Sequence, residues 1–279
     1  MIPSFIIFLR EGIEASMIVA MLLAYLNKTG KRQYFRDVYV GVGAALLLVI
    51  VGGIAVYLAV RHYSGSNVQT YIETTTYLLA ALFLTLMTFW MSRHARSMNT
   101  ELQTRSDVAL SSGKRWGLGV LSAQAVGREG LETMVFTLAI LFTNTSQAGT
   151  PLQGRGVLVG AISGLAVALG LSYLMYKMGT KINLKVFFRV LGVVLMIFAA
   201  GLIADAVENL QSLGWLKVGT QVLWHSGNVL NEGSNLGDIA HSLLGYAQSP
   251  TLAQAVVWVL YVGVSVSYFL AIGRRPQRS

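Results

Sequence analysis

One five-residue pattern, Arg-Glu-Gly-x-Glu, occurs twice in the chain, at residues 10–14 and at residues 128–132. On an α-helix, side chains three or four positions apart share a face. The two glutamates of each copy therefore point the same way, and the arginine lies beside the second glutamate. Both copies sit within apolar stretches, where a charged side chain costs about 3 kcal/mol if the stretch spans a membrane. Because charged side chains are this unfavourable in a membrane, their presence in both copies predicts a functional site.

Paired carboxylates on two helices are suited to binding a cation. If the two copies face each other, four carboxylates and two guanidinium groups come together, with a formal charge of −2. Hard cations prefer carboxylate oxygens as ligands. The predicted metal ligands are Glu11, Glu14, Glu129 and Glu132, with Arg10 and Arg128 as supporting residues. In an alternative interpretation, arginine–glutamate ion pairs only lock two helices together, but one glutamate per arginine would suffice for that.

The remaining residue types narrow the choice of cation. The chain has no cysteine, which excludes disulfides, thiolate metal sites and cysteine nucleophiles. Its four histidines lie outside the predicted spans. This composition argues against copper(I) or zinc as the preferred ion.

The composition predicts an all-α polytopic membrane protein. Hydrophobic residues make up 54% of the chain and charged residues only 12%, against about 25% charged in a typical soluble domain. The mean hydropathy is +0.59. Seven stretches are long enough to cross a bilayer at about 20 residues each. They cover residues 3–26, 38–60, 72–92, 116–142, 157–178, 190–210 and 251–272.

The basic residues predict the orientation of these spans. Sixteen of the 21 lysines and arginines fall in the connections 27–37 and 93–115, at residues 177–189, and in the tail from Arg274. Cytoplasmic loops carry this excess, so the N-terminus is expected outside and the C-terminus in the cytoplasm. The same distribution accounts for the net charge of +9 without a nucleic-acid partner. Trp90 and three further tryptophans near span ends are interpreted as anchors at the membrane interface.

The chain also repeats internally, which predicts its architecture as one membrane domain over residues 1–279. Arg10 and Arg128 are 118 residues apart, and a Val-Gly pair recurs at an offset of 119 residues in the second and fifth spans. A unit of three spans inserts its second copy upside down, as in many transporters whose site lies between inverted repeats. The predicted parts are repeat one at about 3–92, repeat two at about 116–210, an outer loop at 211–250 and a seventh helix at 251–272.

Three carboxylates outside the repeated pattern are candidates for an outer vestibule. Glu73 opens the third span on the outer side, and Asp205 and Glu208 lie at the outer end of the sixth. An acidic mouth would concentrate cations before they enter. Charges at helix ends are also common without a function, so this assignment is a hypothesis.

The sequence resembles the oxidase-coupled iron permeases, a family that includes the fungal high-affinity iron permeases and bacterial ferrous-iron permeases that work with a periplasmic peroxidase. The resemblance covers essentially the whole chain. It rests on the two Arg-Glu-Gly-x-Glu copies, on 89–93 at the end of the third span, on 199–202 in the sixth span, and on Gly245, Tyr246 and Pro250 before the seventh.

The resemblance implies a multi-pass permease of the cell membrane that moves iron inward, with the motif glutamates carrying the metal. Iron, ferric or ferrous, would be the substrate, and no cofactor would be bound permanently. A separate extracytoplasmic oxidase or peroxidase would be a partner, together with an iron-delivery protein and the lipid bilayer.

Two alternatives remain at this point. The same fold could carry manganese, lead or another hard or divalent cation, because carboxylates do not choose sharply among them. An intramembrane enzyme could use the paired carboxylates as acid and base. The chain lacks His-Glu-x-x-His and Gly-x-Ser-x-Gly motifs, so we expect a transporter rather than an enzyme.

Overall fold

The computed structural model describes residues 1–63, 66–94, 104, 108, 116–145, 151–178, 184–227, 230–231 and 234–274. These residues form eight α-helices, which confirms the all-α class. Seven of the helices are long: α1 (Ile2–Lys28), α2 (Phe35–His62), α3 (Asn67–His94), α5 (Gly117–Thr145), α6 (Pro151–Met178), α7 (Leu184–Ser212) and α9 (Leu252–Arg274). A short 3-10 helix, η1 (Arg32–Tyr34), precedes α2, and a short helix, α8 (Asn235–Leu244), lies between α7 and α9.

Each predicted span overlaps one long helix, and five of these helices are apolar enough to cross a membrane by length and composition: α2, α3, α6, α7 and α9. The other two, α1 and α5, contain the repeated pattern, whose three charged residues interrupt the apolar run. Seven of the 16 basic residues used for the predicted orientation, among them Arg96, Lys114 and Arg115, lie outside the described residues.

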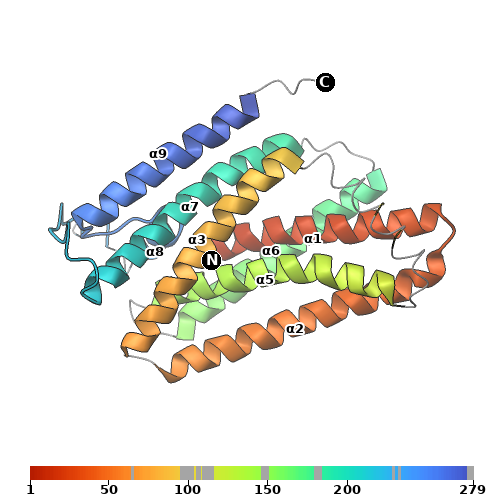
Figure 1. The fold of residues 1–279 in the computed structure, drawn as a ribbon, viewed down its shortest axis with the longest axis horizontal. Helices are drawn as coiled ribbons and strands as arrows, with labels where there is room; N and C mark the ends of the chain where they lie inside the picture. Colours follow the sequence, from red (N-terminus) through yellow and green to blue (C-terminus); the bar gives the residue numbers. More distant parts are fainter. Residues whose placement is uncertain are drawn as a thin grey trace.

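The long helices pair across the two halves of the chain rather than with their sequence neighbours. Helix α1 packs mainly against α6, α2 against α5, and α3 against α7, while α9 lies against α7 at the edge of the bundle (Figure 1). The chain's two halves are therefore interleaved, and neither half forms a separate bundle. This arrangement brings α1 and α5, which carry the repeated pattern, into contact with each other.

The α1–α6 pair runs parallel, because contacts advance in the same direction along both helices. Gly160 lies against the start of α1, and a Cβ atom there would be 2.3 Å from the carbonyl oxygen of Met1. Further along, a Cβ at Gly12 would be 2.8 Å from the Cβ of Ala168. Such close approach of two backbones requires glycine and gives tight packing between apolar helices.

The α2–α5 pair repeats this arrangement. A Cβ at Gly41 would be 2.1 Å from the carbonyl oxygen of Gly119, and a Cβ at Gly130 would be 2.8 Å from Cγ2 of Val49. These four positions correspond to those of the α1–α6 pair at offsets of 118 and 119 residues. The glycine of each Arg-Glu-Gly-x-Glu copy therefore serves packing against a neighbouring helix, on a face that the glutamates do not use.

The buried core and the exposed surface fit a protein surrounded by lipid. Tyr77, Phe136 and Leu195 are among the fully buried side chains of the main core, which lies between α1, α3, α5 and α7. On the outside of the bundle, Leu47 and Leu48 of α2 are 64% and 73% exposed. Large apolar side chains exposed along a whole helix are stable in a bilayer, not in water.

The predicted outer loop contains a helix, α8, that was not expected from the sequence. Helix α8 is capped at its start by Ser234, whose hydroxyl accepts a hydrogen bond from the Gly237 backbone N–H, and at its end by Gly245 in the left-handed conformation at φ 69°. A Cβ at Gly245 would lie 2.4 Å from the Cα of Gly201 in α7. Two glycines quoted for the family resemblance therefore contact each other and hold α8 against α7.

Candidate metal centre

The α1 copy of the pattern is completely buried. Arg10, Glu11 and Glu14 are 3%, 3% and 4% exposed. Arg10 Nη1 donates a hydrogen bond of 2.7 Å to Glu11 Oε1, and Arg10 Nε lies 3.2 Å from Glu14 Oε1. The second contact is the i, i+4 pair that the helical spacing predicts. One guanidinium thus holds both carboxylates of this copy.

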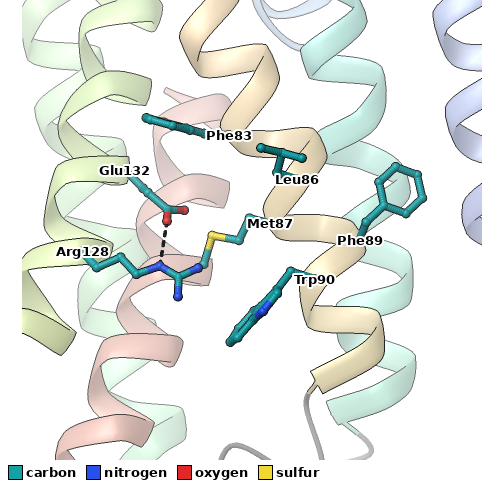
Figure 2. Close-up of a pocket in the computed structure, with 7 residues that line it drawn as sticks. All are labelled: Phe83, Leu86, Met87, Phe89, Trp90, Arg128 and Glu132. Carbon is teal, nitrogen blue, oxygen red and sulfur yellow. Dashed lines mark hydrogen bonds and ion pairs between the residues drawn. The ribbon is translucent and has the colours of Figure 1, made fainter.

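The α5 copy is organised differently. Glu129 is 5% exposed, whereas Arg128 is 49% exposed and contacts only the second glutamate, with Nε 3.3 Å from Glu132 Oε1. The Arg128 guanidinium lies over the indole ring of Trp90 in α3, 4.8 Å from the ring centroid (Figure 2). Stacking of this kind is a favourable cation–π contact.

Three of the four glutamates converge. Glu11, Glu14 and Glu129 each offer a carboxylate oxygen, and these oxygens lie within 4.8 Å of one another. Hard cations bind oxygen at about 2.0–2.6 Å, so oxygens on opposite sides of one ion are about 4–5 Å apart. The donor set and its spacing therefore fit a hard cation. Glu132 lies outside this group and is turned toward Arg128 (Figure 2).

Several buried oxygens of the cluster accept no hydrogen bond. Among the described residues these are Glu11 Oε2, Glu129 Oε2 and Glu14 Oε1, the last of which lies 3.2 Å from Arg10 Nε. Glu132 Oε2, beside the cluster, also accepts none. A buried acceptor without a donor costs about 1–3 kcal/mol, and more when it is charged. Buried carboxylate oxygens of this kind are unfavourable unless a cation or protons supply the missing contacts.

A cavity of about 410 Å³ opens beside Glu132. Its lining comes from α3 and α5: Phe83, Leu86, Met87, Phe89, Trp90, Arg128 and Glu132 (Figure 2). From its place near a span end, Trp90 was expected only as an interfacial anchor and not as a neighbour of the site. Residues 89–93, which include Trp90, were quoted for the family resemblance, and this could have pointed to Trp90. The contact between Trp90 and Arg128, however, depends on the packing of α3 against α5.

The three vestibule candidates lie apart from this group. Glu73 is 6% exposed and accepts a 2.6 Å hydrogen bond from Gln69 Nε2. Glu208 is exposed and accepts a 2.8 Å hydrogen bond from Gln254 Nε2. Asp205 is half-buried on α7. Within the described part of the chain, these residues do not join the Glu11, Glu14 and Glu129 group.

Long apolar helices around a buried, partly unpaired carboxylate cluster define a class of protein, the membrane transporters of cations. Comparison with known proteins identifies the family. The iron permease FTR1 family matches residues 1–274, and the chain belongs to this family. It is therefore a multi-pass permease of the cytoplasmic membrane and a transporter, not an enzyme.

Individual relatives agree with this assignment. The chain is 31% identical over 264 residues to a ferrous iron permease EfeU of Escherichia coli O6:K15:H31, which covers 94% of this chain and 92% of the relative. It is equally similar, 31% over 264 residues, to a ferrous iron permease EfeU of Yersinia pestis, at 94% and 90% coverage. No solved structure matches the chain.

Proposed function

We propose that the protein moves iron inward across the cytoplasmic membrane through the carboxylate cluster of its two Arg-Glu-Gly-x-Glu copies. The observation that carries the proposal is the convergence of Glu11, Glu14 and Glu129 from α1 and α5, buried and with oxygens that lack donors. The name of the relatives, ferrous iron permease, supports iron as the ion.

We also propose that the seven long helices are seven spans, arranged as two inverted three-helix repeats plus α9, with the N-terminus outside. In that arrangement the first and fifth spans run in the same direction, as do the second and fourth. The parallel packing of α1 with α6 and of α2 with α5, through corresponding glycines, supports this topology.

In this proposal each charged residue has a role. Glu11, Glu14 and Glu129 bind the ion, and Glu132 leads from the cluster to the cavity beside Trp90, four residues before the cytoplasmic end of α3. Arg10 and Arg128 hold the carboxylates in place. Glu73, Asp205 and Glu208 attract cations at the outer side.

We further propose that iron is delivered from outside the cell by a separate oxidase or peroxidase, with an iron-delivery protein as a second partner. The resemblance to oxidase-coupled iron permeases supports this partner. The ion would then be handed over at the outer end of the bundle.

The test is uptake of radioactive iron into vesicles containing purified protein. Glu14→Gln and Glu129→Gln keep the side-chain shape and remove a charged ligand, and each is expected to lower uptake more than tenfold. Asp37→Asn, a carboxylate at the start of α2 away from the cluster, is the matched control and should transport normally. Normal uptake by the Glu14/Glu129 double variant would exclude the proposal. Excess manganese or lead that abolishes iron uptake would favour one of those ions as cargo.

A further inference from the structure

The guanidinium of Arg10 has one nitrogen without a hydrogen-bond partner among the described residues. Nη1 donates to Glu11 and Nε contacts Glu14, but Nη2 is buried and has no hydrogen-bond partner. Arg10 lies close enough to all four motif glutamates to interact with each electrostatically. A charged donor left unpaired inside a protein is strongly unfavourable. Nη2 therefore needs an oxygen acceptor that the described side chains do not provide.

The carboxylates of the cluster also leave the shell of a bound ion incomplete. Glu11 Oε1 is already engaged by Arg10, which leaves Glu11 with Oε2 as its free oxygen. Glu129 Oε2 is likewise buried without a hydrogen bond, and Glu14 Oε1 accepts none, although it lies 3.2 Å from Arg10 Nε. Hard cations take about six or more oxygen ligands. With one oxygen from each of three glutamates, about half of the shell must come from elsewhere.

One water can supply both the missing ligand of the ion and the missing acceptor for Arg10 Nη2. The oxygen of a metal-bound water lies next to the ion and can accept a hydrogen bond. We propose that the ion binds in the cluster in a partly hydrated form, and that Arg10 Nη2 donates a hydrogen bond to one of its waters. This inference rests on the proposed function. In this proposal Arg10 is a positioning residue that contacts the transported ion through a water molecule. The substrate is a hydrated hard cation rather than a bare ion.

The second arginine offers a matched control for this role. Arg128 is half-exposed, stacks on Trp90 and contacts Glu132, the glutamate outside the converging group. Its guanidinium is held at the cavity beside the cluster. An effect on the bound water is therefore expected from a change at Arg10 and not from the same change at Arg128.

The experiment uses the full-length protein in lipid nanodiscs with Mn²⁺, a hard paramagnetic ion, as the probe. Electron–nuclear double resonance in water enriched in ¹⁷O reports water bound to the ion. Labelling of arginine with ¹⁵N reports a guanidinium in the second coordination sphere.

We expect both couplings, from ¹⁷O and from ¹⁵N, in the wild-type protein. The ¹⁵N coupling should persist in Arg128→Lys and disappear in Arg10→Lys. Mn²⁺ binding should weaken about tenfold in Arg10→Lys, the loss of one charge-assisted hydrogen bond, and less than threefold in Arg128→Lys.

The outcomes separate this inference from the proposed function. Mn²⁺ that binds through Glu14 and Glu129 but shows no ¹⁷O coupling would overturn the hydrated ion while leaving the carboxylate site standing. A water coupling without a nearby ¹⁵N, or one unaffected by Arg10→Lys, would overturn the role of Arg10. Binding that is insensitive to Glu14→Gln and Glu129→Gln would remove the site and this inference together. If Arg10→Lys cannot be purified, the Arg128→Lys spectrum decides: a ¹⁵N coupling that persists supports Arg10, and one that disappears overturns its role.

Discussion

The two Arg-Glu-Gly-x-Glu copies share a sequence pattern but occupy different surroundings. In α1 the arginine is 3% exposed and contacts both glutamates, whereas in α5 it is 49% exposed and contacts one. The features common to both copies are local: the i, i+4 ion pair and the glycine against a neighbouring helix. The features that differ depend on neighbours, above all on Trp90 and the cavity between α3 and α5. Local repetition therefore sets the chemical groups, and packing sets how each copy can use them.

The largest difference between the copies is expected on removal of each arginine. Arg10→Gln leaves Glu11 and Glu14 buried without their cation, and breaking a buried pair in this way costs about 3–5 kcal/mol. Arg128→Gln removes a half-exposed contact worth about 1 kcal/mol or less. Thermal unfolding of the two purified variants at neutral pH measures both effects. Equal losses of stability would show that the copies are energetically alike.

The motif glycines should, by contrast, behave alike. Gly12→Leu and Gly130→Leu each push a side chain into a helix whose nearest atom would be 2.8 Å from the new Cβ. Overpacking of this kind costs about 1–3 kcal/mol. Gly43→Leu in α2, where a Cβ meets nothing within 4 Å, is the control and should have little effect. Unfolding temperature and purified yield are the measurements, and stability retained by only one motif variant would contradict equivalent packing in the two pairs.

The smallest effect is expected at Trp90. Trp90→Leu removes the stacking on Arg128, which is worth about 0.5–1 kcal/mol at a partly exposed site. Unfolding of Trp90→Leu should be only slightly easier than that of the wild type. In a protein that already carries Arg128→Gln, Trp90→Leu should cost less, because the stacking contact is already lost. Trp116→Leu, an exposed tryptophan next to the start of α5, serves as the control. A full additive loss in the double variant would mean that the two side chains act independently.

The site was only partly predictable from the sequence. The pairing of Arg10 with Glu14 and of Arg128 with Glu132 follows from helical spacing, and both contacts are confirmed. The approach of Glu129 to Glu11 and Glu14 was expected from the repeat, and this convergence is also present. Glu132 was expected in the same group; it lies beside the three converging glutamates, paired with Arg128 at the cavity, and its role as a ligand stays a prediction. Spacing within one helix could not reveal this, since the direction depends on what α3 places beside α5.

The sequence by itself determined the apolar helices, the two charged patterns within them and the face that each pair of glutamates shares. These properties depend on composition and on a helical period of 3.6 residues, which act over a few neighbouring positions. Only the tertiary structure decided that α1 pairs with α6 and α2 with α5, and that Arg10 is enclosed while Arg128 lies on Trp90. Such choices depend on close approach between residues more than a hundred positions apart, such as Gly12 and Ala168. The physical reason is that helix geometry is a local property, whereas the burial and partners of a charge are set by every helix packed around it.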